Sequence, residues 1–238
     1  MPLSITRTAV LLLLSASLLA PASAGTDQPP GNDLLLPADQ HSSEKARQLA
    51  TAHHAALREL SEAIHHCLPW LKMDGKWPIG FFKPKGATGD ERYLSLRVYV
   101  EQGISPQFTQ LSQQERAAAM FSRYVGALLR RMAADEAVLG DPNLDGFTVI
   151  LEWQKPGTRS ADNRLIHETI AVFVKRPAVA GYLAGRLPIA QLSGGAHVLG
   201  WEGETSLGPL QLKAWEDDFV ATRNGPHHEN TKDVTCPR

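Results

Sequence analysis

The segment Leu165–Val174 constrains the fold of this chain more than any other, because apolar residues occupy both its odd and its even positions. Successive side chains of a β-strand point to opposite faces of a sheet. A strand that is apolar on both faces is typical of a central position in a sheet. We therefore expect the chain to build a β-sheet around this segment.

Two further segments have strand patterns. Apolar and polar residues alternate over Leu94–Val100, and Phe147–Gln154 is dense in β-branched and aromatic residues. The polar stretch Lys155–Asn163 separates the second of these from Leu165–Val174, so we expect the two strands to pair as an antiparallel hairpin with a long loop. Short strands are expected around Ile79–Phe82 and after Gly185.

Helical periodicity flanks these strands. Apolar residues recur every three or four positions over 43–67 and again over 113–139, where Gly126 is an interior weakness. Ser112 and Glu115 form a capping box that predicts the start of the second helix. A short helix is expected from Pro177. The fold class is α+β, with a mainly antiparallel sheet of about four to five strands covered by two long helices and one short helix.

The chain begins with a pattern typical of a secretory signal peptide over 1–24, in which Arg7 precedes an apolar run and Ala22-Ser23-Ala24 closes the segment. The apolar run is shorter than the roughly 20 residues that span a bilayer. We expect a linker over 25–41, a single α+β domain over 42–223 and a polar tail over 224–238.

The expected location is outside the cytoplasm, in the periplasm or secreted. The sequence contains no Asn-x-Ser/Thr acceptor, which favours a bacterial export compartment. The formal net charge of −1 provides no basic field for nucleic acid. No second apolar stretch predicts an integral membrane anchor, and no fingerprint predicts a cofactor.

Cys67 and Cys236 are the only cysteines. An even pair in an exported chain favours a disulfide, which would pin the C-terminal tail to the domain. The alternative is a redox thiol, but neither cysteine belongs to a Cys-x-x-Cys motif.

Histidines cluster on the helix expected over 43–67. Helical phase places His65 and His66 opposite the apolar face, toward water, and places His53 within that face. We expect His53 to be a hydrogen-bonded core histidine, and zinc binding is not favoured.

The spacing of Asp141, Asn143, Asp145 and Glu152 matches a minimal calcium-binding loop. In such loops the chain curls into a second helix, which carries the final glutamate back to the ion. Here Phe147–Gln154 is expected to be a strand, which would carry Glu152 away from Gly146. An ordinary turn between helix and strand is the favoured interpretation, and weak calcium binding is the alternative.

Three residues are weak catalytic candidates: Glu168, His197 and Asp217. Glu168 lies among apolar neighbours on its strand, so it needs either a partner or a raised pKa, and a partnered structural glutamate is favoured. His167 and Glu168 point to opposite faces of the strand and cannot act as one acid–base pair.

Acidic and aromatic residues concentrate near the C-terminal end of the domain, where a sugar, a cation or a basic peptide could bind. A solvated loop rim with the tryptophans turned into the core is favoured over such a site. The weak binding candidates are Trp201, Glu202, Glu204 and Trp215.

The familiar catalytic signatures are absent from the sequence, so the favoured function is a non-catalytic periplasmic accessory or binding protein. One alternative is a periplasmic hydrolase with a carboxylate/histidine site. A second is a structural cell-envelope protein with an envelope protein partner. The sequence leaves the ligand open.

Overall fold

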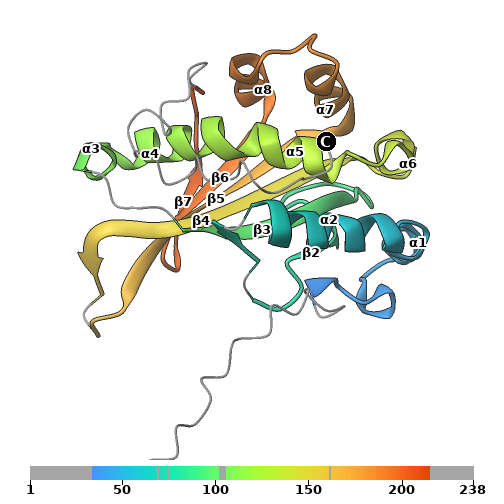
Figure 1. Cartoon of the computed structure of the whole chain (residues 1–238), viewed down its shortest axis with the longest axis horizontal. Coiled ribbons are helices and arrows are strands. Elements are labelled where there is room, and N and C mark those ends of the chain that lie inside the picture. The colour runs from blue at the N-terminus through green and yellow to red at the C-terminus, as the bar shows by residue number, and fades with distance from the viewer. Residues whose placement is uncertain (1–33, 69, 74, 102–105, 161, 215–238) are drawn as a thin grey trace, which may run out of the picture.

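The strands form one sheet in the computed structural model, which describes residues 34–214 except 69, 74, 102–105 and 161. The sheet has seven strands within these residues and is covered by helices on one face (Figure 1). The strands are β1 (Leu71–Lys72), β2 (Ile79–Phe82), β3 (Tyr93–Val100), β4 (Gly146–Arg159), β5 (Leu165–Lys175), β6 (His197–Glu202) and β7 (Thr205–Pro209).

The strand order is β1-β3-β4-β5-β6-β7, and β2 pairs with β3 beside β1. The prediction of an α+β fold with a mostly antiparallel sheet is confirmed, and β5 is interior, between β4 and β6. The predicted number of four to five strands was too low. The short strands β1 and β7 lie at the sheet edges, where two to five residues carry little alternation.

β3 and β4 are the one parallel pair in this sheet, with Leu96 opposite Val149. Parallel neighbours need a long connection between them. Here that connection contains the helices α3 (Pro106–Gln110), α4 (Gln113–Met120), α5 (Gly126–Met132) and α6 (Glu136–Gly140), with a π-helical turn, η3 (Phe121–Val125), between α4 and α5.

The helix expected over 43–67 is divided into α1 (Glu44–Ala52) and α2 (His54–Cys67). His53 lies at the break, where its backbone leaves helical geometry at φ −106° and ψ 14°. Its ring is buried and bonds to Asp141, with Nε2 2.8 Å from Oδ2. The expected hydrogen-bonded core histidine is therefore confirmed, although His53 ends one helix rather than lying inside a longer one.

The helix expected over 113–139 is also interrupted. Its predicted start is confirmed, because the Ser112 hydroxyl accepts from the Glu115 N–H while the Glu115 carboxylate accepts from the Ser112 N–H. The helix leaves α-geometry at η3 and ends at Met132. A new helix, α6, starts after Asp135, whose carboxylate caps the N–H of Ala137.

The β4–β5 hairpin has a longer arm and a shorter loop than expected. β4 continues through Pro156 to Arg159, with a register shift between Gln154 and Arg159. An irregularity of this kind can accommodate a proline, which lacks the N–H that a regular ladder uses. The arm projects beyond the body of the sheet (Figure 1).

Two helices follow the hairpin: α7 (Arg176–Leu183), which is the predicted short helix, and α8 (Ile189–Gly195). Tyr182 of α7 lies against Gly126 of α5. The helices α2, α4, α5 and α7 pack on the sheet face that carries Leu96, Val149 and Val172, and their side chains form one hydrophobic core. We call the opposite side of the sheet the open face.

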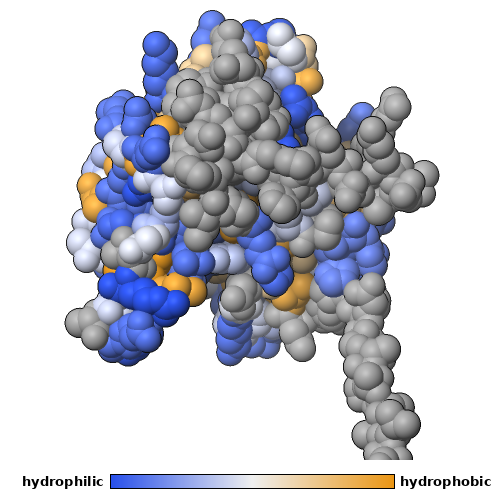
Figure 2. Space-filling view, turned by 60° about the vertical axis from the view of Figure 1, so that its left-hand side comes forward, coloured by the Kyte–Doolittle hydropathy of each residue, from blue (hydrophilic) through white to orange (hydrophobic). Residues whose placement is uncertain are grey.

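No helix among the described residues is long and apolar enough to cross a membrane. The predicted signal peptide, residues 25–33 of the predicted linker and the tail lie outside the described residues. The described end of that linker packs on the domain, because Leu35 is buried and pairs with Ile79 of β2. Figure 2 shows hydrophilic residues interspersed with small groups of hydrophobic residues over the coloured part of one side of the molecule.

Candidate functional site

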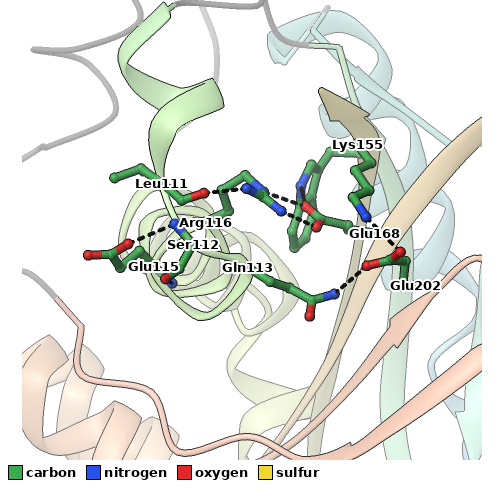
Figure 3. A network of polar contacts seen from close by, with 9 residues as sticks. Leu111, Ser112, Gln113, Glu115, Arg116, Lys155, Glu168 and Glu202 are labelled. Atoms are coloured by element: carbon green, nitrogen blue, oxygen red, sulfur yellow. Dashed lines mark hydrogen bonds and ion pairs between the residues drawn. The ribbon is translucent and has the colours of Figure 1, made fainter. Parts of the chain in front are cut away.

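Glu168 is the most deeply buried carboxylate described, with 1% of its surface exposed. It lies on the helix-covered face of β5, and Arg116 of α4 points toward it (Figure 3). The Arg116 guanidinium donates two bonds, from Nε to Oε2 at 2.8 Å and from Nη2 to Oε1 at 2.5 Å. Trp153 Nε1 donates a third bond to Oε2 at 2.8 Å.

A second carboxylate extends this network toward the surface. Glu202 of β6 lies opposite Glu168 in the strand register. It accepts from Lys155 Nζ at 2.6 Å and from the side-chain amide of Gln113 at 3.2 Å. Arg116 also donates to the carbonyl of Leu111, so the start of α4 is joined to β4, β5 and β6 (Figure 3).

The Arg116–Glu168 pair has the features of a structural contact. Both carboxylate oxygens of Glu168 accept charge-assisted bonds, and both side chains are nearly inaccessible to a substrate. Removing one partner of such a buried, hydrogen-bonded ion pair is costly, because it leaves the other charge buried and uncompensated. The prediction of a partnered Glu168 agrees with this geometry.

The other catalytic candidates do not join Glu168. His197 begins β6 opposite Phe173, on the open face, and its ring lies 5.8 Å from the Phe173 ring. Glu168 lies five positions away along β5, on the covered face. Asp217 falls outside the described residues. The structure therefore does not bring Glu168 and His197 together as a catalytic pair.

The open face contains a polar hollow with a volume of about 390 Å³. Residues of β1, β3, β4 and β5 line it, together with Gly75 in the loop after β1 and Glu101 directly after β3. We call this the open-face hollow, and its lining residues are Lys72, Gly75, Arg97, Tyr99, Glu101, Glu152 and His167.

Glu152 is at the centre of the polar contacts in the open-face hollow. Arg97 Nη2 donates to its Oε2 at 2.6 Å, and His167 Nδ1 lies 2.8 Å from its Oε1. The carboxylate is largely shielded, at 18% exposure, whereas the side chains of Arg97 and His167 are 53% and 37% exposed. Both partners therefore present polar atoms to solvent while they hold the carboxylate in place.

Tyr99 and Lys72 complete the hollow. The Tyr99 ring lies 5.4 Å from the His167 ring, and Lys72 pairs with Glu101. Partial burial raises the pKa of the Tyr99 hydroxyl above its ordinary value, and the nearby carboxylates Glu101 and Glu152 raise the pKa further. The hydroxyl therefore keeps its proton at neutral pH and can donate a hydrogen bond.

The formal charges of the open-face hollow cancel when His167 is neutral, because two cations face two carboxylates. The Glu152–His167 pair resembles the base and orienting group of a hydrolytic site. However, none of the residues that line the hollow is a serine, a threonine or a cysteine. The arrangement is therefore suited to holding a polar ligand or orienting a water, and not to forming an acyl-enzyme.

The residues of the calcium motif have separate protein partners. Asp141 bonds to His53 and to the N–H of Asn143, whereas Asp145 pairs with Lys45 Nζ at 2.7 Å and accepts from the Arg92 N–H. Glu152 lies on β4, as the strand interpretation predicted, and its side chain lines the open-face hollow. Among the described residues, no group of three or more histidine, cysteine or acidic side chains is arranged to hold a metal.

The protein partners of Asp141 set its ionisation. Partial burial acts to raise the pKa of the carboxyl group, but the hydrogen bonds from His53 and the Asn143 N–H outweigh burial. The pKa of Asp141 is therefore lower than its ordinary value.

Strand alternation separates the predicted binding cluster. Trp201 is half-buried on the open face, whereas Glu202 belongs to the covered network. Glu204 is exposed in the turn between β6 and β7, and Trp215 lies outside the described residues. Lys85, in the loop after β2, places its ammonium 6.0 Å from the centre of the Trp201 ring, so this loop extends along the open face.

The sequence interpretation missed Arg116 and the open-face hollow. Arg116 lies outside the apolar stripe predicted for its helix, although the apolar surroundings of Glu168 predict that this carboxylate needs a partner. The sequence alone could have placed Arg97 and Tyr99 on the polar face of their strand, because apolar and polar residues alternate along it. Their proximity to Glu152 and His167 depends on the order β3-β4-β5, which the sequence did not provide.

Comparisons with known proteins identify no relative: no protein-family model, no curated protein and no solved structure matches this chain.

Proposed function

We propose that this chain is an exported, non-catalytic accessory or binding protein that uses the open-face hollow to bind a small ligand. The observation that carries the proposal is the accessible, charge-balanced hollow around Glu152, bordered by exposed parts of Arg97 and His167. Ligand sites are concave and contain a few convergent polar groups. The signal-peptide pattern at 1–24 supports export.

Two other carboxylates, Glu168 and Glu202, are alternative centres for a binding site, but the groups around them favour a structural role. Glu168 is enclosed by Arg116 and Trp153, and Glu202 is engaged by Lys155 and Gln113. Their lone pairs serve internal contacts that join α4 to the sheet. The open-face hollow is the better candidate because Arg97 and His167, the partners of its central carboxylate, are more exposed than Lys155, the cation that pairs with Glu202.

Native mass spectrometry of the protein purified from its export compartment tests both parts of this proposal. We expect a chain that begins at Gly25 and that carries an adduct, which an Arg97→Ala/Glu152→Gln variant loses. Arg58→Ala is the matched control, because the exposed Arg58–Glu62 pair on α2 resembles the Arg97–Glu152 pair but lies away from the hollow. An uncleaved chain would contradict export, and an adduct that the double variant retains would contradict the site.

The second candidate function is a hydrolase, and the 2.8 Å contact between Glu152 and His167 favours it. A neutral histidine whose Nδ1–H is held by a carboxylate presents Nε2 as a base that can activate water. Turnover of a p-nitrophenyl ester panel by the wild-type protein, abolished in His167→Gln, would support this function. Equal rates for both proteins would exclude the pair as a catalytic site for those esters.

A further inference from the structure

We propose that the ligand of the open-face hollow is a neutral saccharide that lies across the strands between Tyr99 and Trp201. This inference rests on the proposed binding function and names its substrate class. Four partly exposed residues carry it, since the register places Tyr99, Glu152, Thr169 and Trp201 in one row across β3, β4, β5 and β6.

The charge balance of the hollow favours an uncharged ligand. Each cation is already within ion-pair distance of a carboxylate, Arg97 with Glu152 and Lys72 with Glu101. A charged ligand beside either ion pair would be attracted by one member of the pair and repelled by the other. A neutral ligand avoids this opposition and can still accept from the cations and donate to the carboxylates.

The hydrogen-bonding groups match hydroxyl groups. A guanidinium presents up to five N–H donors in a fixed fork, a carboxylate is an acceptor, and a sugar hydroxyl can act as donor and acceptor at once. Arg97 and Glu152 are held side by side, with Nη2 and Oε2 2.6 Å apart. Adjacent ring hydroxyls can therefore bond to both groups without breaking the pair.

The aromatic side chains provide the apolar part of the site. Tyr99 and His167 have rings 5.4 Å apart with planes inclined at 50°, which form a corner beside Glu152. Neighbouring strands are about 4.8 Å apart, so Trp201, three strands from Tyr99, lies at the far end of the row roughly 14 Å away. An aromatic residue at each end and polar groups between them suit a ligand with apolar C–H faces and polar edges.

The volume of about 390 Å³ lies at the small end of the range of roughly 300–1,000 Å³ for ligand pockets. The hollow therefore suits one or a few sugar rings. A free sugar and the end of a polysaccharide share this chemistry, so the test must distinguish them by chain length.

Isothermal titration calorimetry of the purified protein tests the inference with four probes: glucose, maltotriose, glucuronate and glucosamine. The last two keep the sugar ring but add a negative or a positive charge. We expect binding of the neutral probes to be at least about tenfold tighter than binding of either charged probe. Tighter binding of maltotriose than of glucose assigns a polysaccharide as the source, and equal affinity assigns a free sugar.

Variants locate the binding site. Arg97→Ala and Tyr99→Leu are each expected to weaken maltotriose binding by about tenfold or more, since each loses a contact of about 1.4 kcal/mol or more. Trp201→Leu is expected to weaken maltotriose binding more than glucose binding, because only the longer ligand reaches the far end of the row. Arg58→Ala is expected to leave both affinities unchanged, and circular dichroism verifies that each variant is folded.

Three outcomes would overturn the inference: no binding of either neutral probe, preference for a charged probe, or neutral binding that Arg97→Ala and Tyr99→Leu leave unchanged. The proposed binding function is decided separately by the adduct in the native mass spectrum. An adduct that depends on Arg97 and Glu152, combined with silent saccharide titrations, would retain the function and exclude the ligand class.

Discussion

At the scale of single residues, Gly126 shows how packing can reverse a helix propensity. A β-carbon built on Gly126 would lie 2.2 Å from the Tyr182 hydroxyl oxygen and 3.0 Å from the ring carbon that carries it. The same tyrosine ring receives the Arg130 guanidinium at 5.0 Å. Gly126, which is unfavourable for a helix by its propensity alone, is therefore the position where α7 approaches α5 closely.

We predict that Gly126→Ala destabilises the protein, although glycine-to-alanine changes inside helices usually stabilise by up to about 1 kcal/mol. The tyrosine must shift to relieve the clash, at a cost of about 1–3 kcal/mol. Gly181→Ala in α7 is the matched control, because its new β-carbon makes only an ordinary contact of 3.7 Å. Urea denaturation measures both changes, and equal stabilisation by the two substitutions would contradict the packing argument.

A second residue-scale prediction concerns Asp141 and pH. The pKa of this carboxyl group is lower in the folded protein than its ordinary value of 3.8, so the ionised form favours folding. Its contribution is complete above the unfolded pKa and is lost as pH falls through the lower, folded pKa. Asp141→Asn should therefore lower the free energy of unfolding by about 1–2 kcal/mol at pH 7 and by less below pH ~4.

Urea denaturation between pH 2.5 and 7 (~0.5-unit steps) measures this dependence. The control is Asp39→Asn, which changes an exposed carboxylate in the short 3₁₀ turn Ala38–Gln40. A loss of stability in Asp141→Asn that stays constant down to the lowest pH would show that the ionised carboxylate is not the source.

At the scale of secondary-structure elements, the Arg116–Glu168 pair fixes α4 on the sheet. The two residues come from the crossover and from an interior strand, separated by 52 positions. Sequence periodicity predicted the main helices and strands individually, but it did not predict where the two long helices are interrupted. The break at His53 coincides with its bond to Asp141, and η3 ends directly before Gly126, against which Tyr182 of α7 lies. Local propensity does not encode either contact.

We predict that Arg116→Met destabilises the protein by about 3–5 kcal/mol, because it leaves a buried carboxylate without its cation. Combining it with Glu168→Gln should recover much of this loss, since the glutamine is neutral and its carbonyl oxygen can still accept from Trp153 Nε1. The control is Arg47→Met, which breaks an exposed, solvent-screened pair with Glu44 and should change stability far less. Additive losses in the double variant, measured by chemical denaturation, would contradict a buried ion pair.

At the scale of the whole molecule, the predicted disulfide would connect the end of α2 to the tail. Cys67 is buried at 7% exposure, and Cys236 lies outside the described residues, so the bridge stays a prediction. It would close a loop of about 170 residues, for which chain entropy gives a stabilisation of roughly 4–5 kcal/mol as an upper value.

Peptide mapping without reductant is expected to recover Cys67 and Cys236 in one linked peptide. The double variant Cys67→Ala/Cys236→Ala should have a lower midpoint of urea denaturation than the oxidised protein, and added reductant should not lower it further. Separate cysteine peptides, or a reductant effect that persists in the variant, would contradict the bridge.

The sequence by itself determined the fold class, the interior position of Leu165–Val174, the capping box at Ser112 and the need of Glu168 for a partner. These follow from periodicity and from the cost of burying a charge, which local sequence expresses. The tertiary structure alone decided that β3 lies parallel beside β4, that Arg116 reaches Glu168, and that Arg97, Tyr99, Glu152 and His167 share one hollow. The physical reason is that strand order and helix docking are set by the packing of the whole core, so residues distant in sequence become neighbours only when the elements assemble.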